Sequence, residues 1–207
     1  MTAPHDGADV RTVIGVDVGT ANLRDADHLI HHLADGLGLP PGTIACTHLI
    51  RTDTRRGTAI SLALTDPGAA AAAWQQLAGM DRPELGAALG DRELGPAESA
   101  RTAALAAAEH AERRSGRAVL YPGVDRLTDT VTVADLLDLT AIDRITVLGQ
   151  PSTHGQGPDP AIPVLTRDHV RPEWQDGQLT LALLPAAGGT LAPFEVPDPT
   201  PCCADHH

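Results

Sequence analysis

The segment TIACTHLIRTDTRRGTAISLALT, residues 43–65, is the most informative part of the sequence. Residues 43–51 alternate between apolar and polar side chains, TDTRRG then supplies turn residues, and residues 58–65 are again rich in Ile, Leu and Ala. Two such runs on either side of a polar connection that contains glycine are typical of a β-hairpin. The segment therefore predicts two antiparallel strands joined by a longer loop.

Regular elements flank this hairpin on both sides. TVIGVDV (12–18) is typical of a buried strand, and residues 25–37 carry Ala, Leu and Ile at helical spacing, with glycines near the end. After the hairpin, Asp66 and Pro67 predict a helix start, because a capping residue directly precedes a proline at the first helical position. The order strand, helix, strand, strand, helix predicts an α+β fold, with a mixed or antiparallel sheet and helices mainly on one face.

The second half of the chain is less regular. An Ala-rich helix is predicted at 96–115, and its inner face of alanines should pack tightly on a flat surface. The remaining predictions are a short helix within 81–94, strands at 117–121, 144–149, 178–184 and 190–196, a helix or a strand and a helix at 131–139, and a long loop at 149–163. We divide the chain into a disordered leader (1–10), one globular domain (11–196) with a weak division near residue 116, and a Pro-rich Cys/His tail (197–207).

Composition excludes several classes of protein. All 15 basic residues are arginine, so the chain cannot supply the lysine of a Schiff base, a P-loop or a protein kinase. The net charge of -12 repels polyanions, and we expect no nucleic-acid partner. No apolar run approaches the ~20 residues of a membrane span, and the first residues lack the apolar core of a signal peptide. We therefore expect a soluble cytoplasmic protein without a membrane partner, and the Arg, Ala, Gly and Pro bias is typical of a bacterium with a GC-rich genome.

The densest cluster of metal-ligating residue types is the C-terminal sequence PTPCCADHH. Cys202, Cys203 and His206 predict a site for zinc or another divalent or soft metal, with His154 as an additional ligand. A solvated chain end is the alternative, because termini fray unless they are tied down.

A second candidate metal site lies in the helix predicted at 25–37. His28 and His32 stand one turn apart on the face opposite the apolar stripe, a spacing at which two neutral imidazoles chelate a divalent ion. The alternative is a solvated polar face without a metal.

The stretch VIGVDVGTANL (13–23) resembles the first phosphate-binding turn of actin-like ATPases, with Asp17, Gly19, Thr20 and Asn22 at the matching places. In that family a second strand follows the turn, whereas here a helix is predicted at once. The chain is also too short for the two lobes of that fold and carries no second phosphate motif. A plain strand-to-helix turn is therefore favoured, and the alternative is an anion site at Gly19 and Thr20.

Two histidines are candidate general bases. His48 shares the face of its strand with Cys46, and it is either a core histidine satisfied by a hydrogen bond or a catalytic base. His154 lies in the long loop, and either histidine would need a carboxylate such as Asp17 or Asp159. No GxSxG or HExxH motif is present.

Three hypotheses of function remain open. The favoured one is a protein that binds a metal ion or small ligand through the C-terminal cysteines and histidines. The second is a hydrolase or transferase that uses a His/carboxylate pair. The third is an interaction or scaffold protein whose Ala-rich helix 96–115 docks on another protein or on a second copy of this chain.

Overall fold

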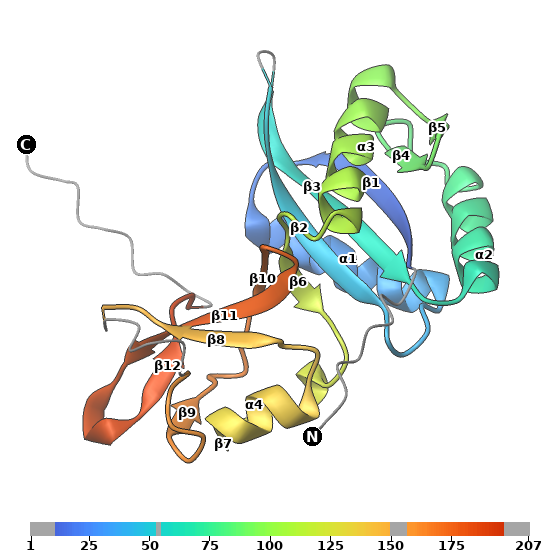
Figure 1. Cartoon of the computed structure of the whole chain (residues 1–207). Helices are drawn as coiled ribbons and strands as arrows, with labels where there is room; N and C mark the ends of the chain where they lie inside the picture. The colour runs from blue at the N-terminus through green and yellow to red at the C-terminus, as the bar shows by residue number, and fades with distance from the viewer. Residues whose placement is uncertain (1–10, 53–54, 150–156, 197–207) are drawn as a thin grey trace, which may run out of the picture. The chain divides into compact units, whose positions relative to one another are not determined.

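The computed structural model describes residues 11–52, 55–149 and 157–196 (Figure 1). These residues form two compact units. The first comprises the chain up to Pro122 together with Trp174–Gly177, and the second comprises the remaining described residues. Each unit is described by itself.

The first unit is built on a sheet with the strand order β5-β4-β1-β3-β2-β6-β10, and its pairs from β5 to β6 are antiparallel. Its elements are β1 (Thr12–Thr20), α1 (Leu23–Leu37), β2 (Ile44–Arg51), β3 (Arg56–Leu64), α2 (Pro67–Ala78), β4 (Gly86–Leu89), β5 (Arg92–Leu94), α3 (Ala97–Ala111), β6 (Arg117–Leu120) and β10 (Glu173–Gln175). The succession β1-α1-β2-β3-α2-β4, with β1 and β3 at the centre, is the split β-α-β or ferredoxin-like arrangement. The pairs β1–β3, β1–β4 and β2–β3 are all antiparallel.

Helices α1 and α2 cover one face of this sheet. The N-terminus of α1 is capped by Asn22, whose side chain accepts a hydrogen bond from the Asp25 amide, and the helix ends at Gly38 in the left-handed conformation. Its apolar stripe packs with Trp74 of α2 and with the inward side chains of β1 and β3, including Ile14 and Ile60. This layer holds the large aliphatic side chains of the unit and forms its main core.

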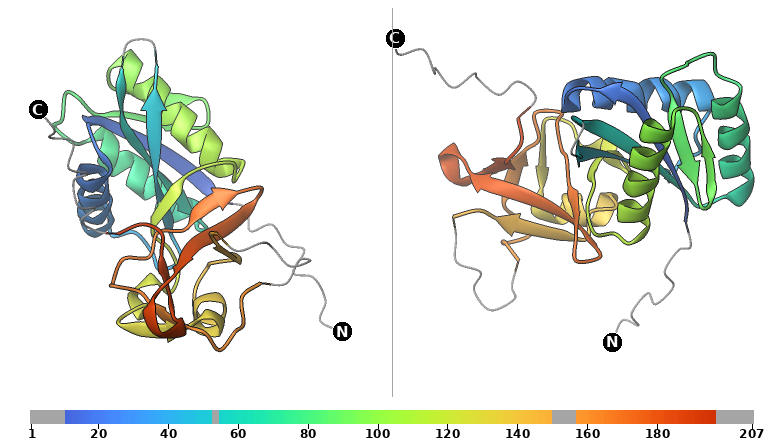
Figure 2. Two further views of the ribbon diagram at one scale, coloured as in Figure 1. Left: turned by 90° about the vertical axis from the view of Figure 1, so that its left-hand side faces the viewer. Right: turned by 90° about the horizontal axis from the view of Figure 1, so that it is seen from above.

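Helix α3 covers the opposite face of the sheet, as the right-hand view of Figure 2 shows. Its backbone lies close to the strands. Its inner face consists largely of alanines, among them Ala103. A Cβ added to Gly15 of β1 would lie 1.8 Å from the carbonyl oxygen of Ala103, and one added to Gly86 of β4 would lie 2.3 Å from the carbonyl carbon of Ser99. The tight packing predicted for the Ala-rich helix is thus confirmed, and glycines on the strands make it sterically feasible.

The short helix predicted within 81–94 is wrong. This segment forms the hairpin β4–β5, which turns at Gly90 with φ +60°. Ala87 and Ala88 suggested a helix because alanine has the highest helix propensity. In the fold they are strand residues, buried at 0% and 1% exposure in a sheet that carries helices on both faces, so packing overrides propensity.

The second unit combines parallel and antiparallel strand pairs. Its elements are η1 (Val124–Arg126), β7 (Thr130–Thr132), α4 (Val133–Leu139), β8 (Arg144–Val147), β9 (Pro163–Leu165), β11 (Gln178–Pro185), η2 (Ala187–Gly189) and β12 (Leu191–Pro193). β8 pairs parallel to β11, β9 pairs parallel to β12, and β7–β9 and β11–β12 are antiparallel. Thr132 and Asp135 form a capping box at the start of α4, and Leu136 and Leu181 lie in the interior.

The predicted fold class is confirmed. The chain is α+β, its strand pairs are mostly antiparallel with parallel pairs in the second unit, and two of the three helices of the first unit share one face. Within the residues that the structure describes, no helix has the length and apolar character needed to cross a bilayer.

Candidate functional site

The side of the first sheet that faces α3 is rich in buried polar side chains. Asp17, His48 and Ser61 point from β1, β2 and β3 toward this helix, and each is at most 2% exposed. Thr102 and His110 meet them from α3 and are at most 3% exposed. Buried polar groups need hydrogen-bond partners, and here they form two separate clusters.

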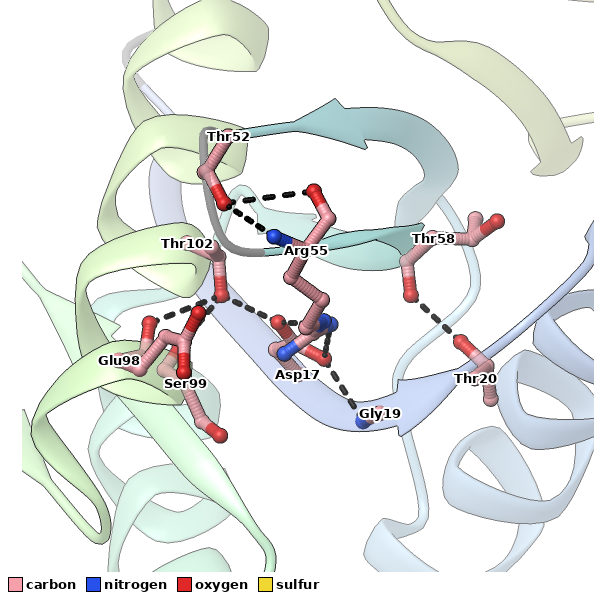
Figure 3. Close-up of polar contacts among 9 residues, drawn as sticks. All are labelled: Asp17, Gly19, Thr20, Thr52, Arg55, Thr58, Glu98, Ser99 and Thr102. Carbon is pink, nitrogen blue, oxygen red and sulfur yellow. Dashed lines mark hydrogen bonds and ion pairs between the residues drawn. The ribbon is translucent and has the colours of Figure 1, made fainter.

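The first cluster is centred on Asp17 (Figure 3). The Nη2 atom of Arg55 donates to both carboxylate oxygens, at 2.7 and 2.6 Å. The Gly19 amide donates to Oδ1 at 2.8 Å, and the Thr102 hydroxyl donates to Oδ2. Asp17 is fully buried. Its ion pair with Arg55 joins β1 to the residue before β3, and its hydrogen bond with Thr102 joins β1 to α3.

The same contacts bear on the predicted anion site. The Gly19 amide is directed to the carboxylate of Asp17, and the Thr20 hydroxyl donates to the carbonyl oxygen of Thr58 (Figure 3). Both donors therefore already have acceptors within the protein. α1 begins at Leu23 directly after this turn, as expected for a plain strand-to-helix turn. In actin-like ATPases a second strand follows the turn instead.

The second cluster is a chain of hydrogen bonds that runs through both nitrogens of His48. Nδ1 lies 3.1 Å from Oε2 of Glu109, and Nε2 lies 2.8 Å from Oγ of Ser61. Oγ of Ser61 also lies 2.7 Å from Nδ1 of His110. Glu109 accepts a further hydrogen bond from the Ser115 hydroxyl at 2.6 Å. The cluster thus joins a carboxylate, an imidazole and a hydroxyl in series.

The protonation state of Glu109 determines which atoms donate and which accept along this series of hydrogen bonds. The hydrogen bond from His48 lowers the pKa of Glu109 to about 2, against the smaller opposing effect of its partial burial. An ionised carboxylate only accepts hydrogen bonds, so His48 carries a proton on Nδ1. In the uncharged form of His48, which carries this one proton, Nε2 is an acceptor and the Ser61 hydroxyl donates to it.

His110 completes the chain in an uncharged state. Burial lowers its pKa to about 3, and a positive charge on His48, when that ring is protonated, acts in the same direction, as do the charges of Arg11 and Arg113. Within the described residues its Nε2 atom is buried without a hydrogen-bond partner. The neighbouring Cys46 thiol is also fully buried, and this burial raises its pKa far above the usual range.

Two of the predicted catalytic residues, His48 and Asp17, lie beneath α3 but do not form one pair. The third, His154, lies outside the described residues. Asp17 contacts α3 at Thr102, whereas His48 contacts it at Glu109, seven positions or about 10 Å further along the helix axis. The carboxylate partner of His48 is therefore Glu109. Asp159 belongs to the second unit, where its side chain accepts a hydrogen bond from the Ala161 amide.

The predicted metal ligands stay predictions. Cys202, Cys203, His206 and His154 lie outside the described residues. His28 and His32 are exposed on α1. Across the described ranges, no three His, Cys, Asp or Glu side chains come together as a metal site would require.

Sequence reasoning missed Ser61, Glu109 and His110. The hairpin register offered one signal, because Ser61 is the direct partner of Cys46 and thus shares a face with His48. The position of Glu109 and His110 depends on how α3 lies across the sheet, and the local sequence pattern does not encode this.

Comparisons with known proteins add no further constraint: no protein-family model, no curated protein and no solved structure matches this chain.

Proposed function

We propose that the first unit is a hydrolase or acyl transferase with Ser61 as nucleophile, His48 as general base and Glu109 as the carboxylate that orients His48. The observation that supports this proposal is the simultaneous engagement of both His48 nitrogens, with a carboxylate at Nδ1 and a serine hydroxyl at Nε2. This is the arrangement by which serine nucleophiles are activated in unrelated folds.

The chemistry follows from the order of the protons. His48 Nε2 takes the hydroxyl proton as Ser61 Oγ attacks the carbonyl carbon of an ester or another acyl compound. The same nitrogen then protonates the leaving alcohol, which leaves an acyl group on Ser61. Water or another acceptor attacks this acyl group, His48 again takes a proton, and the hydroxyl of Ser61 is restored.

Access to Ser61 requires α3 to open, because Ser61 is 0% exposed beneath it. The inner face of α3 consists mainly of alanines with Thr102 and His110, whereas α1 buries Leu29, Ile30 and Leu33. Small side chains bury little apolar area, at about 25 cal/mol per Å². Among the helices of this unit, α3 buries the fewest large apolar side chains, although its backbone lies close to the strands. The proposal requires that α3 opens locally despite this close approach.

A serine-reactive fluorophosphonate probe tests the proposal. Wild-type protein should be labelled at Ser61, identified by peptide mass spectrometry, and labelling should accelerate in urea below the unfolding transition as α3 opens. Ser61→Ala and His48→Asn should abolish it, and Ser99→Ala, a change elsewhere on α3, should retain it. Failure of folded wild-type protein to react under both conditions would overturn the proposal.

The complete burial of Ser61 favours a second candidate, a non-catalytic interaction module in which the same hydrogen bonds fasten α3 to the sheet. The alanine face of α3 is covered by its own sheet, so a partner would contact its outer face, where Leu105 is 50% exposed. Under this candidate Ser61→Ala lowers the melting temperature and no probe labelling occurs in either protein.

A further inference from the structure

The position of Ser61 between two imidazoles raises a question of proton order. Its oxygen lies 2.8 Å from Nε2 of His48 and 2.7 Å from Nδ1 of His110, both within hydrogen-bond distance. A hydroxyl has one proton to donate and two lone pairs to accept with. Only one of the two contacts can therefore use the serine proton, and the other must be donated by a ring nitrogen.

We propose that His110 is a positioning residue that donates its Nδ1 proton to Ser61 and thereby holds the serine proton on the side of His48. This inference rests on the proposed function of Ser61 and names an additional residue for it. The ionised Glu109 accepts a hydrogen bond from His48 Nδ1, so in the uncharged form of this ring Nε2 accepts from Ser61. The remaining contact of Ser61 is then filled by His110 as donor.

The surroundings of His110 agree with this assignment. The ring is 3% exposed, and burial favours its uncharged form, which carries a single proton. With that proton on Nδ1, the buried Nε2 atom carries only a lone pair, and the described residues offer it no hydrogen-bond donor. With the proton on Nε2, the two ring nitrogens facing Ser61 would compete for one hydroxyl proton, and a buried N–H would be left without an acceptor.

Nitrogen NMR of protein labelled at histidine tests the proton order directly. At pH 8, both His48 and His110 should carry a proton on Nδ1 and none on Nε2, with the two rings assigned through their backbone resonances. In Ser61→Ala, His110 loses its acceptor and should show a mixture of tautomers. A proton on Nε2 of His110 in the wild-type protein would overturn the proposal, whatever the outcome of the labelling experiment.

A matched pair of variants tests the positioning role. His110→Asn places an amide N–H near the position of Nδ1 and should label with the fluorophosphonate probe at close to the wild-type rate. His110→Leu has similar bulk and no donor, and it should label at least about tenfold more slowly. Equal rates in the two variants would refute the role of His110. No labelling of wild-type protein would instead refute catalysis by Ser61 and leave the tautomer measurement to decide the direction of the hydrogen bonds.

Discussion

Replacing His110 by asparagine should reduce the amount by which the free energy of unfolding falls as the pH is lowered. In the folded protein burial lowers the pKa of His110 to about 3, whereas the ordinary value of 6.5 applies once the chain is unfolded. Between these values the unfolded chain binds a proton that the folded protein does not, so the free energy of unfolding falls as the pH is lowered. The slope approaches 1.4 kcal/mol per pH unit, and the loss from pH 7 to pH 5 is about 2 kcal/mol.

Urea unfolding at pH 7 and pH 5 measures this loss. Wild-type protein should lose about 2 kcal/mol more than His110→Asn between the two pH values, and the exposed control His28→Asn should behave as wild type. The contribution of Glu109 is small in this window, because its pKa moves from an ordinary 4.5 to about 2, and its stabilisation is lost only as the pH falls further. Equal losses in wild type and His110→Asn would show that the ring is not held uncharged.

Three further substitutions or modifications test the packing around α3. Gly15→Ala should lower the free energy of unfolding by about 3 kcal/mol, because the new Cβ would lie 1.8 Å from a backbone oxygen of α3. Gly36→Ala on α1, with nothing within 4 Å, should raise it by up to about 1 kcal/mol, and urea unfolding compares the two. Asp17→Asn breaks a buried ion pair and should lower the free energy of unfolding by about 3 kcal/mol. The surface change Glu112→Gln should lower it by less than about 0.5 kcal/mol, and similar effects of the two changes would contradict a structural role for the buried pair. The Cys46 thiol should be alkylated about a hundredfold more slowly in native protein than in urea, as measured by peptide mapping, because it is buried and its pKa is raised; rapid native alkylation would contradict the closed position of α3.

Much of the fold could be predicted because local patterns and packing agree. The hairpin 43–65 alternates with the period of a strand, and α1 carries its apolar stripe at helical spacing. Pro67 starts α2 and Gly79 ends it, as the sequence indicates. The segment that forms the hairpin β4–β5 was mispredicted as a helix because it contains alanines, which favour helices. In the fold its small residues allow α3 to pack closely on the sheet.

The candidate site could be predicted only in part. The alternation in β2 placed His48 and Cys46 on one buried face, and the structure confirms this. His48 and its carboxylate partner Glu109 are 61 positions apart, and their contact depends on the path of α3 over the strands. Sequence reasoning paired His48 with Asp17 because both are chemically suitable, but suitability does not determine distance.

The return of the chain to its first unit at Trp174 has a consequence for biosynthesis. The Trp174 amide bonds to the carbonyl of Gly116 at 3.0 Å, and its indole ring lies 6.0 Å from the ring of His110. A ribosome releases this strand only after it has synthesised residues 123–173, which belong to the second unit. Folding of the first unit can therefore be completed only after residues 123–173 have been synthesised. A gene truncated after Pro122 would encode a sheet that lacks β10.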